Sequence, residues 1–124
     1  MKSKVFKTLA LLLGLFMIAI GLNKFLVFTV IPSPPGDGGA LMEIYLTSGF
    51  LKLVGILEIL GGIALLMHRF VPLGLVLITA IMFNATTFHA LHDPSGIGPA
   101  AVSLGICLIL IYAHKARFSV LWSS

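Results

Sequence analysis

Residues 47–67, TSGFLKLVGILEILGGIALLM, decide the fold of this chain, because they form a long apolar run whose only charged residues are Lys52 and Glu58. A helix rises about 1.5 Å per residue and the hydrocarbon core of a bilayer is about 30 Å thick, so a helix over this run can cross a membrane. Gly55 and Gly62 recur along it, and small residues let membrane helices approach closely. The run therefore predicts a membrane-spanning helix packed against another helix.

Three other apolar runs have a similar length, and breaks rich in Pro, Gly and His separate the four. The other runs cover Val5 to Ile31, Phe70 to Leu91 and Ile97 to Ala113. The breaks are residues 32–39, His68–Arg69 with Pro72, and residues 92–96. Pro lacks a backbone donor and Gly tolerates positive φ, so such clusters interrupt helices. We expect the apolar stretch 40–46 to extend the second span into the outer interface. The sequence thus predicts an all-α, integral membrane four-helix bundle, with residues 1–124 as a single transmembrane domain.

The composition agrees with this class and excludes several others. Hydrophobic residues make up 59% of the chain and charged residues 10%, against about 25% charged in an average soluble domain. A soluble enzyme is therefore excluded. Cys107 is the single cysteine, so an intrachain disulfide and a Cys-x-x-Cys relay are excluded too. The net charge of +4 is scattered at helix ends, which indicates topology and argues against a nucleic-acid partner.

The basic residues predict the orientation, because Lys and Arg near the ends of spans are retained on the cytoplasmic side. Six of the eight lie before the first span, between the second and third, or after the fourth: Lys2, Lys4, Lys7, Arg69, Lys115 and Arg117. The opposite loops carry no Lys or Arg, and their charged residues are acidic: Asp37, Glu43 and Asp93. We therefore expect a multi-pass protein with both termini in the cytoplasm. The first apolar run is too long for a signal peptide, so we expect it to remain as a span.

Polar side chains within the spans are the candidates for function, because burying them is costly unless they meet a partner or a wet cavity. They are Asn23, Lys24, Lys52, Glu58, Asn84 and His89. Counting about 1.5 Å per residue from the outer ends places Glu58 near the midplane, at about 16 Å, and the others closer to the outer surface. All of them lie in the outer half of the membrane.

Two of these side chains are expected to face each other. Gly14, Gly21 and Lys24 share one side of the first span, and Glu58 shares one side of the second span with its glycines. Since small residues mark the closely packed side of a membrane helix, both charged residues should point into the bundle. Their depths differ by about 6 Å, which a lysine side chain can bridge. We hypothesise that Lys24 and Glu58 pair or share a wet cavity.

The remaining candidates allow two interpretations each. Lys52 lies on an isoleucine stripe, which favours a lipid-facing side chain that snorkels to the surface over a functional role. Asn84 either forms an interhelical hydrogen bond or lines a pocket with the charged residues. His89 and His92 have a spacing that a metal could use, but two ligands are a weak signal, so we predict no metal and favour an interfacial or ligand-contacting His89. No catalytic residue can be assigned.

Several segments together resemble the DoxX family of small four-helix bacterial membrane proteins. They are Gly21-Leu22-Asn23-Lys24-Phe25, the Pro-rich loop, Ser48-Gly49-Phe50, the run from Glu58 to Leu66 with its Gly61-Gly62, and Asn84 with Phe88-His89. Some members are linked to quinone-coupled oxidation of thiosulfate, and others to membrane oxidoreductase complexes or oxidative-stress responses. The resemblance implies a multi-pass protein of the bacterial inner membrane. It also implies that Lys24, Glu58, Asn84 and His89 are the family-like polar positions. This chain has only the short four-span module, which argues against an autonomous oxidoreductase.

These observations lead to one preferred function and two alternatives. The first is a redox-associated subunit or quinone-proximal binding module with an outer-half polar pocket lined by Asn23, Lys24, Glu58, Asn84 and His89. Quinone is then the cofactor to consider and an oxidoreductase the expected partner, besides the lipid bilayer. The alternatives are a carrier or exporter of a small molecule that uses the same ion pair, and a structural membrane partner without a ligand of its own. Self-association is compatible with all three.

Overall fold

The computed structural model describes residues 2–26 and 35–119, and these residues are almost entirely helical. The elements are α1 (Lys2–Leu26), α2 (Gly36–Ser48), α3 (Phe50–Met67), α4 (Val71–His92), the short 3-10 helix η1 (Pro94–Gly96), α5 (Ile97–Ala113) and α6 (Lys115–Phe118). No strand occurs among the described residues. The all-α prediction is therefore confirmed for this part of the chain.

Four of the helical segments are long and apolar enough to cross a membrane. They cover Lys4–Leu26, Phe50–Met67, Val71–His92 and Pro94–Ala113. Their outer surfaces carry large exposed apolar side chains such as Leu26, Phe83 and Leu91, which suits contact with lipid. Each of the four predicted spans therefore contains a helix that is long and apolar enough to cross a membrane, although the outer end of the first, residues 27–31, lies outside the described residues.

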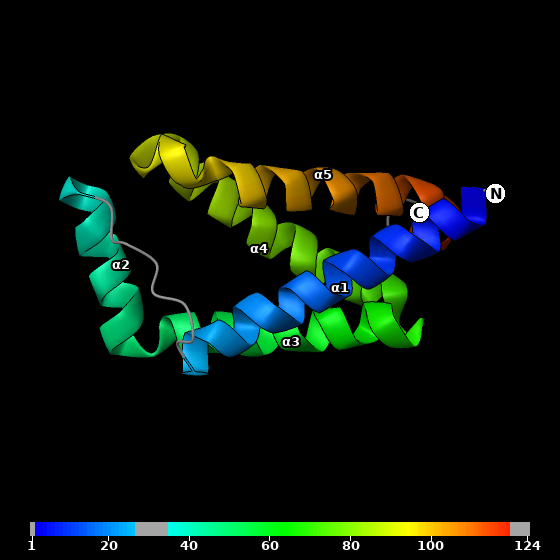
Figure 1. Ribbon diagram of the computed structural model, residues 1–124, viewed down its shortest axis with the longest axis horizontal. Coiled ribbons are helices and arrows are strands. Elements are labelled where there is room, and N and C mark those ends of the chain that lie inside the picture. The colour runs from blue at the N-terminus through cyan, green and yellow to red at the C-terminus, as the bar shows by residue number, and fades with distance from the viewer. Residues whose placement is uncertain (1, 27–34, 120–124) are drawn as a thin grey trace.

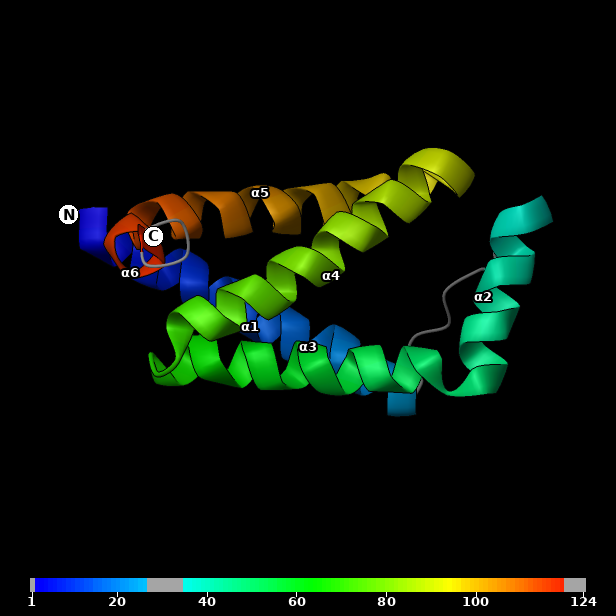
Figure 2. The ribbon, with the colours of Figure 1, turned by 180° about the vertical axis from the view of Figure 1, so that it is seen from behind.

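The four long helices form a bundle in which α3 and α5 lie on opposite sides and α1 and α4 run obliquely between them (Figure 1). Helix α1 packs along α3, whereas α4 contacts α3 near its start and α5 further on (Figure 2). The fully buried side chains include Met17, Leu65, Leu75, Ile78 and Leu110. The start of α1 and helix α6 lie at one end of the bundle and α2 lies at the other (Figure 1, Figure 2). This arrangement gathers the three basic regions at the same end.

The stretch before α3 differs from the prediction. Instead of extending the second span, residues 40–46 belong to the separate helix α2, which begins at Gly36 within the predicted break. Gly49 ends α2 with φ 81°, a left-handed conformation that Gly adopts without steric cost. The chain turns sharply there, and the Tyr45 and Phe50 rings stack across the corner with centroids 5.1 Å apart. The long apolar helix α3 therefore starts at Phe50, and α2 points away from its axis (Figure 2).

The turn between α3 and α4 is tight. His68 and Phe70 both adopt positive φ, 53° and 56°. Non-glycine residues rarely occupy this region, and holding them there costs of order 1–3 kcal/mol each. The backbone N–H of His68 donates to carbonyl oxygens at the end of α3, which helps to hold this conformation.

Candidate functional site

Helices α1 and α3 are joined by direct contact between their backbones. A Cβ atom on Gly21 would lie 2.7 Å from the carbonyl oxygen of Gly55, and one on Gly62 would lie 2.6 Å from that of Gly14. A Cβ on Gly14 would lie 2.8 Å from the facing carbonyl oxygen, so a side chain at any of these three positions would displace a helix. At Gly55 the corresponding distance is 3.0 Å, which leaves almost no spare room. The two glycine pairs set the register of the two helices, as the small-residue stripes predict.

This register brings Lys24 and Glu58 together. Lys24 Nζ donates to Glu58 Oε1 at 2.6 Å, so the predicted pairing is confirmed. The Glu58 side chain is 2% exposed and that of Lys24 is 18% exposed. Lys24 Nζ also lies 3.5 Å from the carbonyl oxygen of Ile20, one turn earlier in α1. The pair therefore links two helices through a charge-assisted hydrogen bond that is largely shielded.

The stability of the protein depends on both members of the pair, because a buried charge needs its partner to compensate it. Taking two charges out of water is expensive, and their attraction offsets this cost only while the geometry is good. Removing one partner from a buried pair destabilises a protein by about 3–5 kcal/mol, because the other charge is left uncompensated. Two helices held together by glycine contacts give the geometry that such a pair requires.

The two asparagines expected at the site have different positions relative to the pair. Asn23 is half-buried on the turn of α1 that carries Lys24. Asn84 lies on the exposed face of α4, so the structure does not bring it to the pair. The buried face of α4 carries Leu75, Ile78 and Met82. Asn84 follows Met82 by two residues, which corresponds to about 200° around a helix, so it points away from the core.

His89 belongs to a separate cluster where α4 ends. Its Nδ1 lies 3.3 Å from the carbonyl oxygen of Asp93 and 3.6 Å from Asp93 Oδ2. Ser95 Oγ donates to the other carboxylate oxygen of Asp93 at 2.9 Å. The Phe88 ring meets His89 edge-on with centroids 5.5 Å apart. His89 thus orders the turn into α5, and neither Asn84 nor His89 joins Asn23, Lys24 and Glu58 in the expected five-residue pocket.

Two further expectations concern Lys52 and metal binding. Lys52 is exposed on α3, as its isoleucine stripe predicts for a lipid-facing side chain. Within residues 2–26 and 35–119, no three His, Cys, Asp or Glu side chains lie close enough together to hold a metal ion. His92 contacts the Phe88 ring, with centroids 5.5 Å apart.

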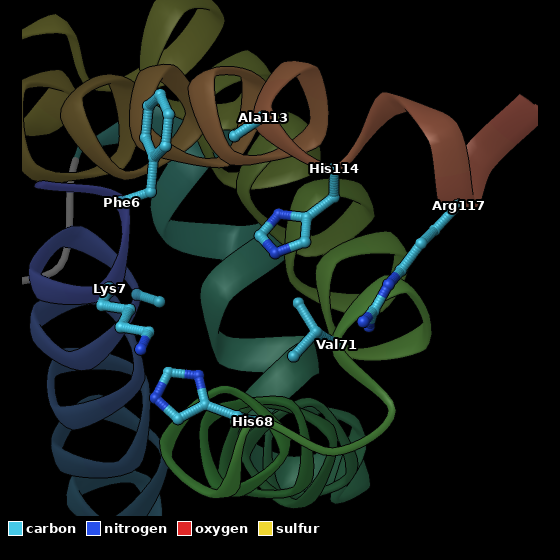
Figure 3. Close-up of a pocket in the computed structure, with 8 residues that line it drawn as sticks. Phe6, Lys7, His68, Val71, Ala113, His114 and Arg117 are labelled. Atoms are coloured by element: carbon cyan, nitrogen blue, oxygen red, sulfur yellow. The ribbon is translucent and has the colours of Figure 1, made fainter. Parts of the chain in front are cut away.

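A second polar site, which the sequence did not predict, lies at the end of the bundle where α1 begins and α6 is found. Lys7, His68, His114 and Arg117 line an open cavity of about 450 Å³ there (Figure 3). These residues come from three distant parts of the chain, and the only signal in the sequence was that basic residues cluster at the inner ends of the predicted spans.

A second cavity, of about 470 Å³, lies between α1 and α5 and is lined almost entirely by apolar side chains. Its lining includes Leu12, Phe16 and Val102. Neither of these two cavities includes the Lys24–Glu58 pair. Comparison of the chain with protein-family models, with curated proteins and with solved structures finds no match.

Proposed function

We propose that the chain is a DoxX-like multi-pass protein of the bacterial inner membrane, with both termini in the cytoplasm. In this proposal it acts as a redox-associated subunit or quinone-proximal binding module centred on Lys24 and Glu58. Three observations support it: four helices that could span a membrane, basic regions gathered at one end of the bundle, and the order of motifs along the chain. An ionisable pair among membrane helices is expensive, and such pairs commonly mark a functional site.

The observation that carries the proposal is the hydrogen-bonding state of Lys24. An ammonium group has three donors, and the contacts to Glu58 and Ile20 use two of them. The side chain is also partly exposed, which leaves a path for a ligand to reach it. A quinone carbonyl oxygen can accept a hydrogen bond from this third donor. The same oxygen takes up a proton when the quinone is reduced. Glu58 balances the charge of Lys24, and Asn23 on the same turn is the next candidate contact.

The structure makes this proposed site smaller than the sequence suggested. Asn84 and His89 lie elsewhere, so the quinone-proximal contacts reduce to Lys24 and Glu58 with Asn23 beside them. A pair of this size can orient one polar head group, while the isoprenoid tail of a quinone would lie in the surrounding lipid. The site therefore suits a binding module better than a self-contained catalyst.

The test is to purify the protein in mild detergent and to measure bound quinone by mass spectrometry. Lys24→Gln/Glu58→Gln is the main variant, because an amide pair keeps a hydrogen bond between the helices and avoids an unpaired buried charge. Lys52→Gln is the matched control, since it removes an exposed lysine from α3. We expect the wild type and the control to retain quinone and the double variant to lose it.

Other results would favour the alternatives. Equal quinone content in the wild type and the double variant, or none in either, contradicts the proposal. Substrate flux into liposomes that contain only this protein would indicate a carrier. Full tolerance of Lys24→Met/Glu58→Leu, with no copurifying quinone or oxidoreductase, would indicate a structural partner in which the pair only sets helix register.

A further inference from the structure

The cavity at the terminal end of the bundle concentrates positive charge. Lys7 comes from α1, His68 from the turn after α3, His114 from the end of α5 and Arg117 from α6. Figure 3 shows these four side chains around one space, with Lys7 beside His68 and the His114 ring between them and Arg117. Two permanent cations and two imidazoles therefore share an opening of about 450 Å³.

No acidic side chain neutralises this cluster. The chain has four acidic residues, Asp37, Glu43, Glu58 and Asp93. Two of them belong to α2 at the opposite end of the bundle (Figure 1), Glu58 is paired with Lys24, and Asp93 lies in the turn before α5. Like charges held together repel one another unless a counterion is present. The arrangement therefore favours an anion from outside the chain.

The local structure holds the basic side chains around the cavity. His114 Nδ1 lies 2.9 Å from the carbonyl oxygen of Leu110, which makes Nδ1 the donor and leaves Nε2 for another partner. Phe118 is 3% exposed and anchors α6, so its neighbour Arg117 is held near the cavity. His68 is kept in its unusual left-handed conformation by the tight turn after α3. Strained residues of this kind cluster at ligand sites.

We infer that this cavity binds a phosphate-type anionic group, and specifically the headgroup of an anionic phospholipid. The guanidinium of Arg117 and the ammonium of Lys7 suit phosphate oxygens, and Arg can bind them through two hydrogen bonds. The remaining walls are apolar, with Phe6, Ala10 and Val71, and can accept the glycerol and upper acyl carbons of a lipid. Basic pockets between spanning helices on the cytoplasmic side are suited to such headgroups.

The test compares binding of phosphatidylglycerol with that of phosphatidylcholine by native mass spectrometry of the detergent-purified protein. Lys7→Gln/Arg117→Gln removes both permanent cations from the cavity. Lys4→Gln/Lys115→Gln is the matched control, because it removes the same charge at the same end from exposed residues that do not line the cavity. Each basic residue near an anionic surface contributes about fivefold to affinity, so the cavity variant should bind phosphatidylglycerol about 30-fold more weakly than the wild type.

The lipid preference of the wild type and of the two variants decides whether the inference holds. Preference of the wild type for phosphatidylglycerol, lost in the cavity variant and kept in the control, supports the inference. Equal weakening in both variants, or equal binding of both lipids by the wild type, overturns it. A parallel measurement of thermal stability with inorganic phosphate separates the two sources of the anion. Stabilisation by phosphate alone overturns the lipid assignment, and stabilisation by the lipid alone supports it.

Discussion

The Lys24–Glu58 pair makes a quantitative prediction, because its two members are buried to different extents. Replacing Lys24 with Gln leaves a carboxylate that is 2% exposed, whereas replacing Glu58 with Gln leaves an ammonium that is 18% exposed. We expect Lys24→Gln to lower the free energy of unfolding by about 3–5 kcal/mol, the cost of an uncompensated buried charge. Glu58→Gln should cost less, about 1.5–3 kcal/mol, because it removes a charged hydrogen bond but the lysine can move its ammonium group towards water.

A double-mutant cycle measures the coupling directly. Because each single substitution leaves the other charge unpaired, Lys24→Gln/Glu58→Gln should be less destabilised than the sum of the two single variants, by at least about 1 kcal/mol. The assay is reversible unfolding in mixed micelles, followed by circular dichroism at increasing fractions of denaturing detergent. Lys52→Gln is the control and should stay within about 0.5 kcal/mol of the wild type, because its side chain is exposed.

Two results would refute this reasoning. If the effects of the two single substitutions add without coupling, the pair contributes nothing beyond its separate side chains. If Glu58→Gln is more damaging than Lys24→Gln, the difference in burial does not control the cost of breaking the pair. The first outcome would also remove the energetic support for a functional pair at this position.

Three further predictions concern the backbone and the topology. Gly62→Ala should destabilise the protein by about 1–3 kcal/mol in thermal unfolding, because its Cβ would lie 2.6 Å from a carbonyl oxygen of α1. Gly105→Ala is the control and should not destabilise the protein, because a Cβ there meets open space. Gly49→Ala should cost about 1 kcal/mol, since φ is 81° there; no loss would contradict the left-handed corner. An impermeant maleimide should label Ser95→Cys in intact cells and Ser119→Cys only after permeabilisation. The native Cys107 is buried and should contribute little background labelling. Labelling of both variants in intact cells would refute the proposed orientation.

The Lys24–Glu58 pair could be predicted from the sequence, whereas the position of Asn84 could not. Glycines at helical spacing mark the packed face of α1 and of α3, and both charged residues lie on those faces. Helix α4 offers no such guide around Asn84, because no glycine marks a packed side there and its neighbours include both apolar residues and the threonines Thr86 and Thr87. When lipid and protein core are equally apolar, hydrophobic periodicity does not distinguish the inner face of a helix from the outer one.

The corner at Gly49 and the basic cavity depended on tertiary structure for a different reason. Glycine permits a left-handed turn but does not require one, so the sequence of residues 40–50 is equally compatible with a continuous helix. The cavity forms only because α6, which follows His114, places Arg117 on the same opening as Lys7, more than a hundred residues earlier in the chain. Local spacing carries no information about such a distant contact.

By itself the sequence determined the number of apolar helices, the end of the bundle at which the basic regions gather, and the pairing of one lysine with one glutamate. These features follow from length, charge placement and glycine spacing, all of which act within single helices or between neighbouring ones. Only the tertiary structure decided the rotation of α4, the direction of α2 and the convergence of four basic side chains on one cavity. Each of these depends on how whole helices pack, and packing is a property of facing surfaces that no single segment contains.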